Sequence, residues 1–166
     1  MKNILFDIIS KLTDENIDFV ICGGVACFLQ GCERTTYDLD INLSMEENNI
    51  EKTISLFKKL GFTARIPEPM ENLKNEIKRK EWVEKKGALV YTVNEPKGLF
   101  QIDIFLTYPI SYEELKRNAD VFDIDNKNIL VSSAKDLIIA KKSINPLRDK
   151  DIFDLKQLEA IENGKL

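Results

Sequence analysis

Two aspartates one residue apart, Asp38 and Asp40, constrain this chain more than any other feature. They begin the segment Asp38–Leu43, which we predict to be a strand. Side chains alternate between the two faces of a strand, so both carboxylates point to the same side. Neighbouring carboxylates repel each other, and burying them is costly unless a cation neutralises their charge.

A second strand is predicted earlier in the chain, and it ends in two glycines. The apolar run Phe19–Cys22 stops at Gly23 and Gly24, which precede a short apolar helix. Such a turn leaves backbone N–H groups where an anion can approach closely. Taken alone, however, a Gly-Gly pair is also typical of an ordinary tight turn, and an exposed strand face can carry aspartates harmlessly.

A third carboxylate changes this balance. Asp103 lies within residues 99–106, a run apolar enough to be a central strand. An acid there is costly to bury unless it binds a metal or pairs with a lysine or arginine. If this strand lies beside Asp38–Leu43, three carboxylates meet on one face. Such a cluster suits one or two magnesium ions, and the glycine turn could then hold the phosphates that those ions also bind.

The composition excludes several other kinds of site. The chain contains no histidine, so imidazole acts neither as a base nor as a metal ligand. Any metal site is expected to use oxygen ligands and a hard cation such as magnesium. Cys22, Cys27 and Cys32 do not have a zinc-ligand spacing, and their odd number fits a disulfide framework poorly. We interpret them as small buried side chains in a reducing cytoplasm.

Size and charge favour a single globular domain over residues 1–166. The net charge of −4 argues against a protein that coats nucleic acid without regard to sequence. No apolar run approaches the roughly 20 residues of a membrane helix. The N-terminus lacks the pattern of a signal peptide. We therefore expect a cytoplasmic protein with no membrane contact.

Periodicity and turn residues predict mixed helices and strands. Helices are expected at about 3–13, 25–30, 44–60, 111–117, 132–141 and 148–161. The helix at 44–60 would begin with a capping box of Ser44 and Glu47. Further strands are expected at 62–66, 88–93 and around 129–131, and the strand at 88–93 forms a hairpin with 99–106. This pattern indicates an α/β (α+β) fold: a mixed sheet with helices packed on it and a helical C-terminal third.

Residues 73–86 are polar and mostly basic, with Trp82 among the lysines and Tyr91 nearby. A basic segment with aromatic residues suits a surface that faces RNA. Segments of mixed charge are more often simply solvated, and we favour that interpretation.

The joint pattern resembles the polymerase-beta-type nucleotidyltransferase superfamily, and the expected mixed sheet is of that type. More narrowly, it resembles the AbiEii-type, toxin-like branch over about residues 15–158. The residues that carry this resemblance are Gly23, Gly24, Val25, Ala26, Gly31, Arg34, Thr36, Asp38, Asp40 and Asp103, with 135–141 and 148–155. Two positions depart from the pattern. Gly24 replaces the usual serine and removes a hydroxyl, and Gln30 stands where relatives of the branch often carry histidine.

The resemblance implies a catalytic and metal-binding role for Asp38, Asp40 and Asp103, with two magnesium ions. Asp103 would help bind the ion nearest the acceptor and assist deprotonation of the attacking hydroxyl.

Nucleotide contacts are expected from Gly23, Gly24, Arg34 and Lys141. Two alternatives stay open, since Arg34 could simply hold its loop and Lys141 could be an ordinary solvated lysine. Asp151 matches a motif of the branch, but we favour an ion pair with Arg148 or Lys150.

The expected function is therefore a magnesium-dependent nucleotidyltransferase. It would move a nucleoside monophosphate from a nucleoside triphosphate such as ATP to a hydroxyl of RNA, of a protein or of a small molecule such as an aminoglycoside or lincosamide. A toxin role, with an antitoxin as partner, follows only from the branch resemblance. The alternative is a catalytically silent nucleotide-binding or interaction domain of the same fold. Three mutually repelling acids argue against that alternative, because they cost stability if no cation binds them.

Overall fold

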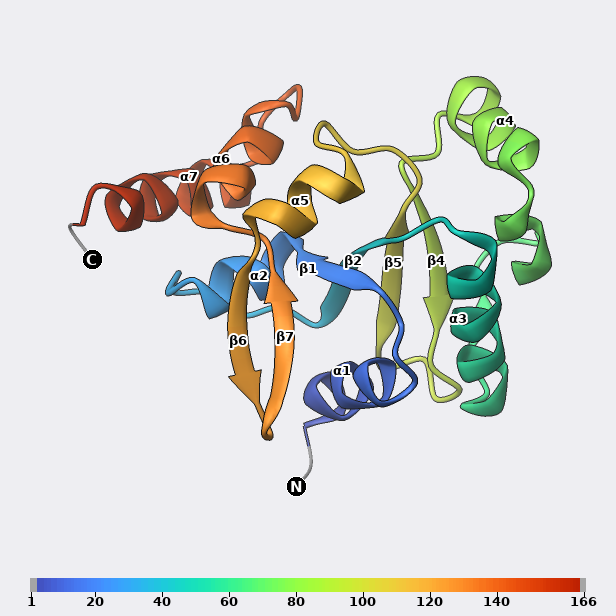
Figure 1. Ribbon diagram of the computed structural model, residues 1–166. Helices are drawn as coiled ribbons and strands as arrows, with labels where there is room; N and C mark the ends of the chain where they lie inside the picture. Colours follow the sequence, from blue (N-terminus) through green and yellow to red (C-terminus); the bar gives the residue numbers. More distant parts are fainter. Residues whose placement is uncertain (1–2, 165–166) are drawn as a thin grey trace.

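The computed structural model describes residues 3–164, which form a mixed seven-stranded sheet with packed helices (Figure 1). The strands are β1 (Phe19–Cys22), β2 (Asp38–Leu43), β3 (Thr63–Ala64), β4 (Val90–Asn94), β5 (Gln101–Phe105), β6 (Asp120–Ile124) and β7 (Lys127–Val131). The helices are α1 (Ile4–Asp14), α2 (Gly23–Leu29), α3 (Glu47–Lys59), α4 (Glu76–Lys86), α5 (Tyr112–Asn118), α6 (Ala134–Lys142) and α7 (Asp149–Glu162), with a short 3₁₀ helix η1 (Met70–Lys74). The predicted fold class is confirmed.

The order of the strands across the sheet is β3-β4-β5-β2-β1-β7-β6. At the centre, β2 pairs in parallel with β5 and antiparallel with β1. The β4–β5 and β6–β7 pairs are antiparallel, and β7 runs parallel to β1. The two strands that carry aspartates in the predicted site are therefore direct neighbours.

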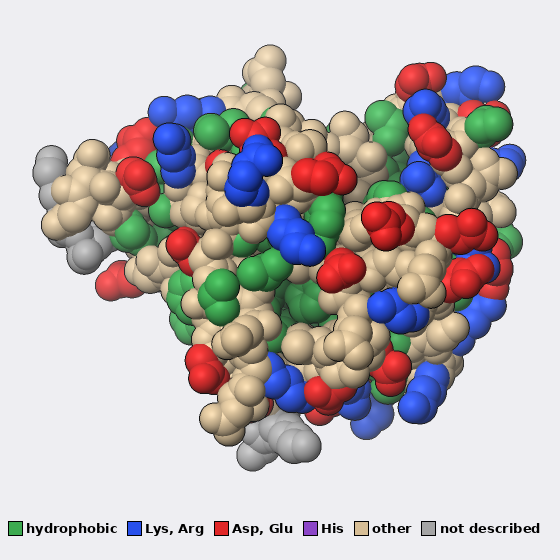
Figure 2. Space-filling model, viewed as in Figure 1, with side chains coloured by type: hydrophobic (Ala, Val, Ile, Leu, Met, Phe, Trp, Pro, Cys, Tyr) green, Lys and Arg blue, Asp and Glu red, His purple; other side chains and the backbone are tan. Residues whose placement is uncertain are grey.

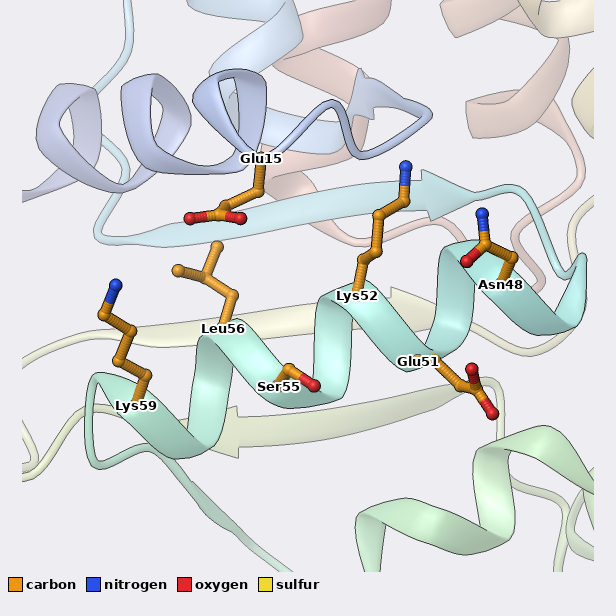
Figure 3. Close-up of a pocket in the computed structure, with 7 residues that line it drawn as sticks. All are labelled: Glu15, Asn48, Glu51, Lys52, Ser55, Leu56 and Lys59. Carbon is orange, nitrogen blue, oxygen red and sulfur yellow. The ribbon is translucent and has the colours of Figure 1, made fainter.

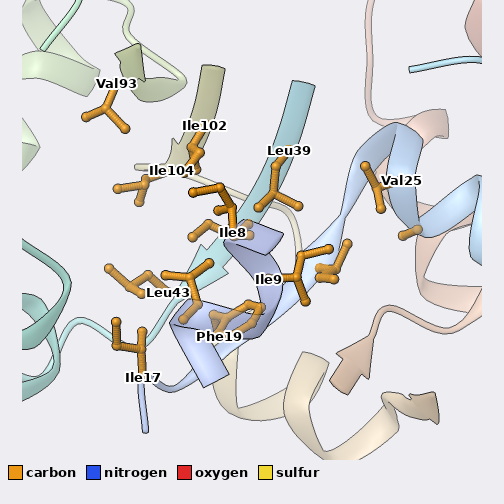
Figure 4. Close-up of a cluster of buried hydrophobic side chains, with 14 of the residues drawn as sticks. Ile8, Ile9, Ile17, Phe19, Val25, Leu39, Leu43, Val93, Ile102 and Ile104 are labelled. Atoms are coloured by element: carbon orange, nitrogen blue, oxygen red, sulfur yellow. The ribbon is translucent and has the colours of Figure 1, made fainter. Parts of the chain in front are cut away.

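One face of the sheet carries the main hydrophobic core. The apolar faces of α1 and α3 pack on it, as their helical spacing predicts. Figure 4 shows part of this cluster, in which side chains of α1 lie against those of the central strands. The strand positions in this core include Phe19, Ile21, Leu39, Ile41, Leu43, Val93, Ile102 and Ile104.

The alternate strand positions face the other side of the sheet. There Val20 and Cys22 of β1 join Leu115 of α5, and Ile110 from the segment before that helix, in a smaller buried cluster. Asp38, Asp40 and Asp103 alternate with core residues along β2 and β5, so they lie on this second face. We call it the site face.

Two local features differ from the prediction. The glycine pair does not precede α2 but forms its first two residues. The capping box of Ser44 and Glu47 is absent, because α3 begins after Glu46 without a side-chain cap. The carbonyl of Ser44 instead accepts a hydrogen bond from the Asn49 side chain at 2.9 Å.

The strand β6, which was not predicted, adds a hairpin with β7 to the C-terminal third. All three cysteines are buried free thiols, as interpreted from the sequence. Of the described helices, none is long and apolar enough to cross a membrane.

Candidate active site

A row of side chains crosses four neighbouring strands on the site face. Asp40 of β2 is the direct partner of Asp103 of β5. Asp103 is in turn opposite Thr92 of β4, and Asp40 is opposite Cys22 of β1. Cross-strand partners lie side by side, so Cys22, Asp40, Asp103 and Thr92 form one line, which we call the carboxylate row. Asp38 lies two residues before Asp40 on the same face.

Asp103 is held by neutral donors. The hydroxyl of Thr92 donates to one Asp103 oxygen at 2.5 Å, and the amide nitrogen of Gln101 lies 3.3 Å from the other. No lysine or arginine among residues 3–164 forms an ion pair with Asp103, so the ion-pair alternative is not what the structure shows. The side chain is oriented without being neutralised.

The other two carboxylates have raised pKa values. Burial, with the charge of Asp103 as the next cause, raises the pKa of Asp40 to about 7. The backbone N–H of Gly24 donates to Asp40 and offsets part of this effect. Burial and Asp103 also raise the pKa of Asp38, although Lys150 and Arg65 act in the opposite direction. The three acids therefore form a site whose repulsion is only partly relieved by the protein itself.

The two glycines allow close approach of the backbone to polar side chains. Gly23 has a φ of +59°, and a Cβ there would lie 2.1 Å from an oxygen of Asp40. A Cβ on Gly24 would lie 2.9 Å from Cζ of Arg34 and 2.9 Å from the hydroxyl oxygen of Thr36. The backbone N–H of Gly24 donates to Asp40 in this structure, and the phosphate contact expected of Gly24 stays a prediction. Both glycines are thus required by the packing of the site itself.

A cluster of ion pairs around two buried aspartates, Asp151 and Asp154, ties the last two helices to the loop before β2. An oxygen of Asp154 lies 2.5 Å from Nη1 of Arg34 and 2.8 Å from Nζ of Lys141. Lys141 also lies 3.3 Å from Asp151, which in turn pairs with Nε of Arg148 at 2.6 Å. We call these five residues the ionic cluster. The interpretation of Asp151 as a partner of Arg148 is confirmed.

The ionic cluster bears on two predicted nucleotide contacts. The Lys141 side chain is only 9% exposed and lies between two aspartates, so it is not the solvated lysine of the alternative interpretation. Its role toward a triphosphate stays a prediction. Arg34 lies over Gly24 and is anchored by Asp154, so it holds its loop in place. A contact between Arg34 and a phosphate stays a prediction.

Three further cations near the carboxylates were not assigned to the site from the sequence. Lys150 and Arg65 lower the pKa of Asp38 against burial and the charge of Asp103. The hydrogen bond to Asp151 is the main cause that raises the pKa of Arg148, and the charge of Asp40 adds to it. All three residues are exposed. Lys150 and Arg148 lie within residues 148–155, the C-terminal motif of the family resemblance, and this was the sequence signal that could have assigned them to the site. Arg65 has no such signal, because only strand pairing brings it to the site.

The three aspartates offer the oxygen ligands that magnesium prefers, but their side chains are not arranged as a complete coordination site. Within residues 3–164, no group of three or more His, Cys, Asp or Glu side chains is arranged to hold a metal ion. Asp38, Asp40 and Asp103 nevertheless share one face and offer only oxygen ligands, which hard divalent cations prefer. Binding would require these side chains to turn toward a common ion, and the ion would relieve their repulsion.

A pocket elsewhere on the surface is unrelated to this site. It has a volume of about 370 Å³ and lies along α3 beside the end of α1 (Figure 3). Its lining residues are Glu15, Asn48, Glu51, Lys52, Ser55, Leu56 and Lys59. Because α1 and α3 cover the core face, this pocket lies across the sheet from the carboxylate row.

The basic segment 73–86 forms η1 and α4 rather than an open basic surface. Trp82 is buried and stacks on Tyr91 with ring centroids 5.4 Å apart, so neither ring is free to stack on a base. Five lysines of this segment form ion pairs with glutamates: Lys74, Lys78, Lys80, Lys85 and Lys86. Figure 2 shows basic and acidic side chains mixed over α4. These contacts favour the interpretation of residues 73–86 as a solvated face over that of a surface that binds RNA.

No protein-family model matches the chain, and no curated protein matches it by sequence. Solved structures do match it in fold. The lincomycin-bound lincosamide antibiotic adenylyltransferase LnuA superposes with a TM-score of 0.64 at 15% identity over 95% of each chain. An antigenic nucleotidyltransferase-like protein from Paracoccidioides brasiliensis gives 0.57 at 18% identity, over 93% of this chain and 73% of that one. ANT(2")-Ia in complex with adenylyl-2"-tobramycin gives 0.54 at 13% identity, over 98% and 94%. The chain therefore has the fold of these nucleotidyltransferases.

Proposed function

We propose that this protein is a nucleotidyltransferase that moves a nucleoside monophosphate from a nucleoside triphosphate to a hydroxyl group. The observation that carries this proposal is the pairing of Asp40 with Asp103, with Asp38 on the same face. Clustered carboxylates that repel each other are costly to a fold and suit a bound divalent cation. The nucleotidyltransferase fold supports the same conclusion.

The residues divide into two groups in this proposal. Asp38, Asp40 and Asp103 would hold the magnesium ions, with two ions expected from the family resemblance. Magnesium, when bound, offsets the charge of a triphosphate and lowers the pKa of a coordinated hydroxyl. Lys150 and Arg148 lie on the α7 side of the row, where they would contact the phosphates.

Asp103 is the residue that would receive the proton of the acceptor. Thr92 donates to one oxygen of its carboxylate at 2.5 Å and Gln101 to the other at the longer distance of 3.3 Å, so these two side chains orient the group that would accept the proton. The acceptor oxygen forms a bond to the α-phosphorus, and the bond from that phosphorus to the β-phosphate breaks. Pyrophosphate leaves with the electron pair of the broken bond.

A small molecule is the acceptor that the fold neighbours favour. LnuA is described as a lincosamide antibiotic adenylyltransferase, and a structure of ANT(2")-Ia holds adenylyl-2"-tobramycin. ATP is accordingly the first triphosphate to test. A toxin role and an antitoxin partner rest on the branch resemblance alone, and they stay predictions.

The decisive experiment is transfer of label from α-³²P-labelled triphosphates, each tested with magnesium and a panel of hydroxyl compounds, RNA and protein. Label should move to an acceptor with the natural chain and disappear in Asp38→Asn and Asp103→Asn. Glu84→Gln, on an exposed position of α4, is the matched control and should keep full activity. Equal labelling by all four proteins would exclude this site.

A catalytically silent domain makes a different prediction, which thermal unfolding can test. A silent interaction domain would not be stabilised by a triphosphate in a magnesium-dependent way. For the enzyme, we expect a rise in the melting temperature that needs both ligands, because they bind only the folded state. The rise should be absent in Asp38→Asn.

A further inference from the structure

Arg65 extends the carboxylate row toward the edge of the sheet. It directly follows β3, and its backbone N–H donates to the carbonyl of Thr92 at 3.0 Å. The antiparallel register of β3 and β4 pairs Ala64 with Val93, so the next residue lies opposite Thr92. Arg65 therefore faces the same side as Thr92 and lies two strands from Asp103.

The guanidinium of Arg65 is uncommitted within the described residues. Arg65 is exposed, and its side chain makes no ion pair or hydrogen bond with another residue of 3–164. It is close enough to the site to act on the pKa of Asp38, against burial and the charge of Asp103. An arginine remains charged at any working pH and presents five donors in a planar fork.

The cations around the carboxylates come from two opposite sides. Lys150 and Arg148 belong to the start of α7, which packs on α6, and α6 packs on α2 with its glycine pair. Arg65 comes from the other side, beyond Asp103 and next to β4. Because Asp103 is the residue proposed to act on the acceptor, Arg65 lies on the acceptor side of the row.

We propose that Arg65 is a specificity-determining residue that binds an anionic group of the acceptor. The acceptor would be a small hydroxyl compound that carries a phosphate or a carboxylate near its reacting hydroxyl. This inference rests on the proposed function and narrows its substrate class. Between Arg65 and the carboxylates, the site face of β3, β4 and the start of β5 carries neutral donors and acceptors: Thr63, Thr92, Asn94 and Gln101.

The same geometry disfavours a polycationic acceptor. Tobramycin carries several ammonium groups, and an unpaired arginine beside the acceptor position repels such a molecule. This chain would therefore share its fold with ANT(2")-Ia but use a different class of acceptor.

Matched acceptor pairs test the proposal. Ribose 5-phosphate is compared with ribose, galacturonate with galactose, and tobramycin serves as the cationic acceptor. The natural chain should prefer the anionic member of each pair. Arg65→Ala should lower kcat/KM for the anionic member about 10- to 100-fold, the usual effect of losing a hydrogen bond to a charged group. For the neutral member the change should stay within about threefold. Arg65→Lys should retain part of the preference, and Arg65→Glu should shift it toward tobramycin.

Binding measurements separate this inference from the proposed function. Calorimetry with a non-hydrolysable triphosphate should give similar affinities for the natural chain and Arg65→Ala, while ribose 5-phosphate binding weakens in the variant. Lys59→Ala, across the sheet on α3, is the control and should change neither. If anion binding depends on Arg65 but no label is transferred, the proposed function fails and the anion site stands. Equal binding of ribose 5-phosphate by both proteins, or a loss of triphosphate affinity in Arg65→Ala, would overturn the inference.

Discussion

Asp40 and Asp103 are direct partners on the parallel strands β2 and β5, so two carboxylates lie side by side on one face of the sheet. The Asp103 charge adds to burial in raising the pKa of Asp40 to about 7. Near neutral pH, without a bound cation, protonation of Asp40 therefore relieves the repulsion within the pair. The stability of the metal-free protein must then depend on pH.

Asp40→Asn is expected to stabilise the metal-free protein at alkaline pH. The pKa of Asp40 rises from an ordinary value of 3.8 to about 7 on folding. Between these values the unfolded chain has released its proton and the folded chain has not, so stability falls as the pH rises. Removing the charge should raise the free energy of unfolding by roughly 1–3 kcal/mol at pH 8, and the gain should largely vanish at pH 4.

Urea unfolding in the presence of a chelator measures this difference. Trp82 is the single tryptophan and is buried, so its fluorescence reports the unfolding transition. Asp123→Asn, on an exposed position of β6, serves as the control. Parallel stability curves for the natural chain and Asp40→Asn across this pH range would contradict the raised pKa.

Gly23→Ala should abolish the site rather than merely strain the backbone. A Cβ at this position would lie 2.1 Å from an oxygen of Asp40, which must then move. Gly87→Ala offers a matched control, since Gly87 has a φ of +62° and a Cβ added there would meet no heavy atom within 4 Å. Both variants should lose about 1–2 kcal/mol of stability to the left-handed conformation.

Only Gly23→Ala should also lose magnesium-dependent stabilisation by a triphosphate. Thermal unfolding with and without both ligands measures the two effects together. Equal ligand-induced shifts in the two glycine variants would show that contact with Asp40 does not restrict position 23.

The central part of the site could be predicted from the sequence because its signals are local. Alternation along β2 places Asp38 and Asp40 on one face, and the apolar character of β5 indicates a central strand around Asp103. Both rules depend only on residues next to each other in the chain. The adjacency of the two strands was a condition of the predicted cluster, and the pairing of β2 with β5 meets it.

The remaining features depend on long-range pairing or on weaker signals. β6 contains two aspartates and lies at the edge of the sheet, so its apolar content is low. Asp125 and Asn126, with φ values of 52° and 61°, form the turn to β7, and this Asp-Asn pair was the available hairpin signal. Arg65 reaches the site only because β3 pairs with β4, which no local pattern indicates.

Lys141→Ala should destabilise the protein strongly. The lysine is buried between Asp151 and Asp154, and its removal leaves two aspartates short of a partner. Breaking a buried ion pair from one side typically costs about 3–5 kcal/mol. Adding Asp151→Asn to Lys141→Ala should recover part of this loss, because one of the two carboxylates that faced the lysine is then uncharged and only Arg148 is left beside it.

A double-mutant cycle by urea unfolding measures the coupling between these two residues. Lys142→Ala is the control, since this exposed neighbour forms an ion pair with Glu159 at the surface. If Lys141→Ala unfolds at the same urea concentration as the control but binds triphosphate weakly, Lys141 acts on the nucleotide and not on the fold.

Lys150→Ala should weaken triphosphate binding without changing stability. The side chain is exposed, and it lowers the pKa of Asp38 against burial and Asp103, so its charge reaches the carboxylates. A phosphate that loses one charged hydrogen bond binds roughly tenfold less tightly or worse. Calorimetric titration with a non-hydrolysable triphosphate and magnesium measures the affinity, and the melting temperature without ligand should stay unchanged.

Lys156→Ala, exposed further along α7, is the control and should bind the triphosphate as the natural chain does. Because Arg65 lies on the opposite side of the row, Arg65→Ala should also keep its triphosphate affinity. If Arg65→Ala instead loses triphosphate affinity and Lys150→Ala does not, the triphosphate binds on the Arg65 side of the row and the acceptor on the Lys150 side.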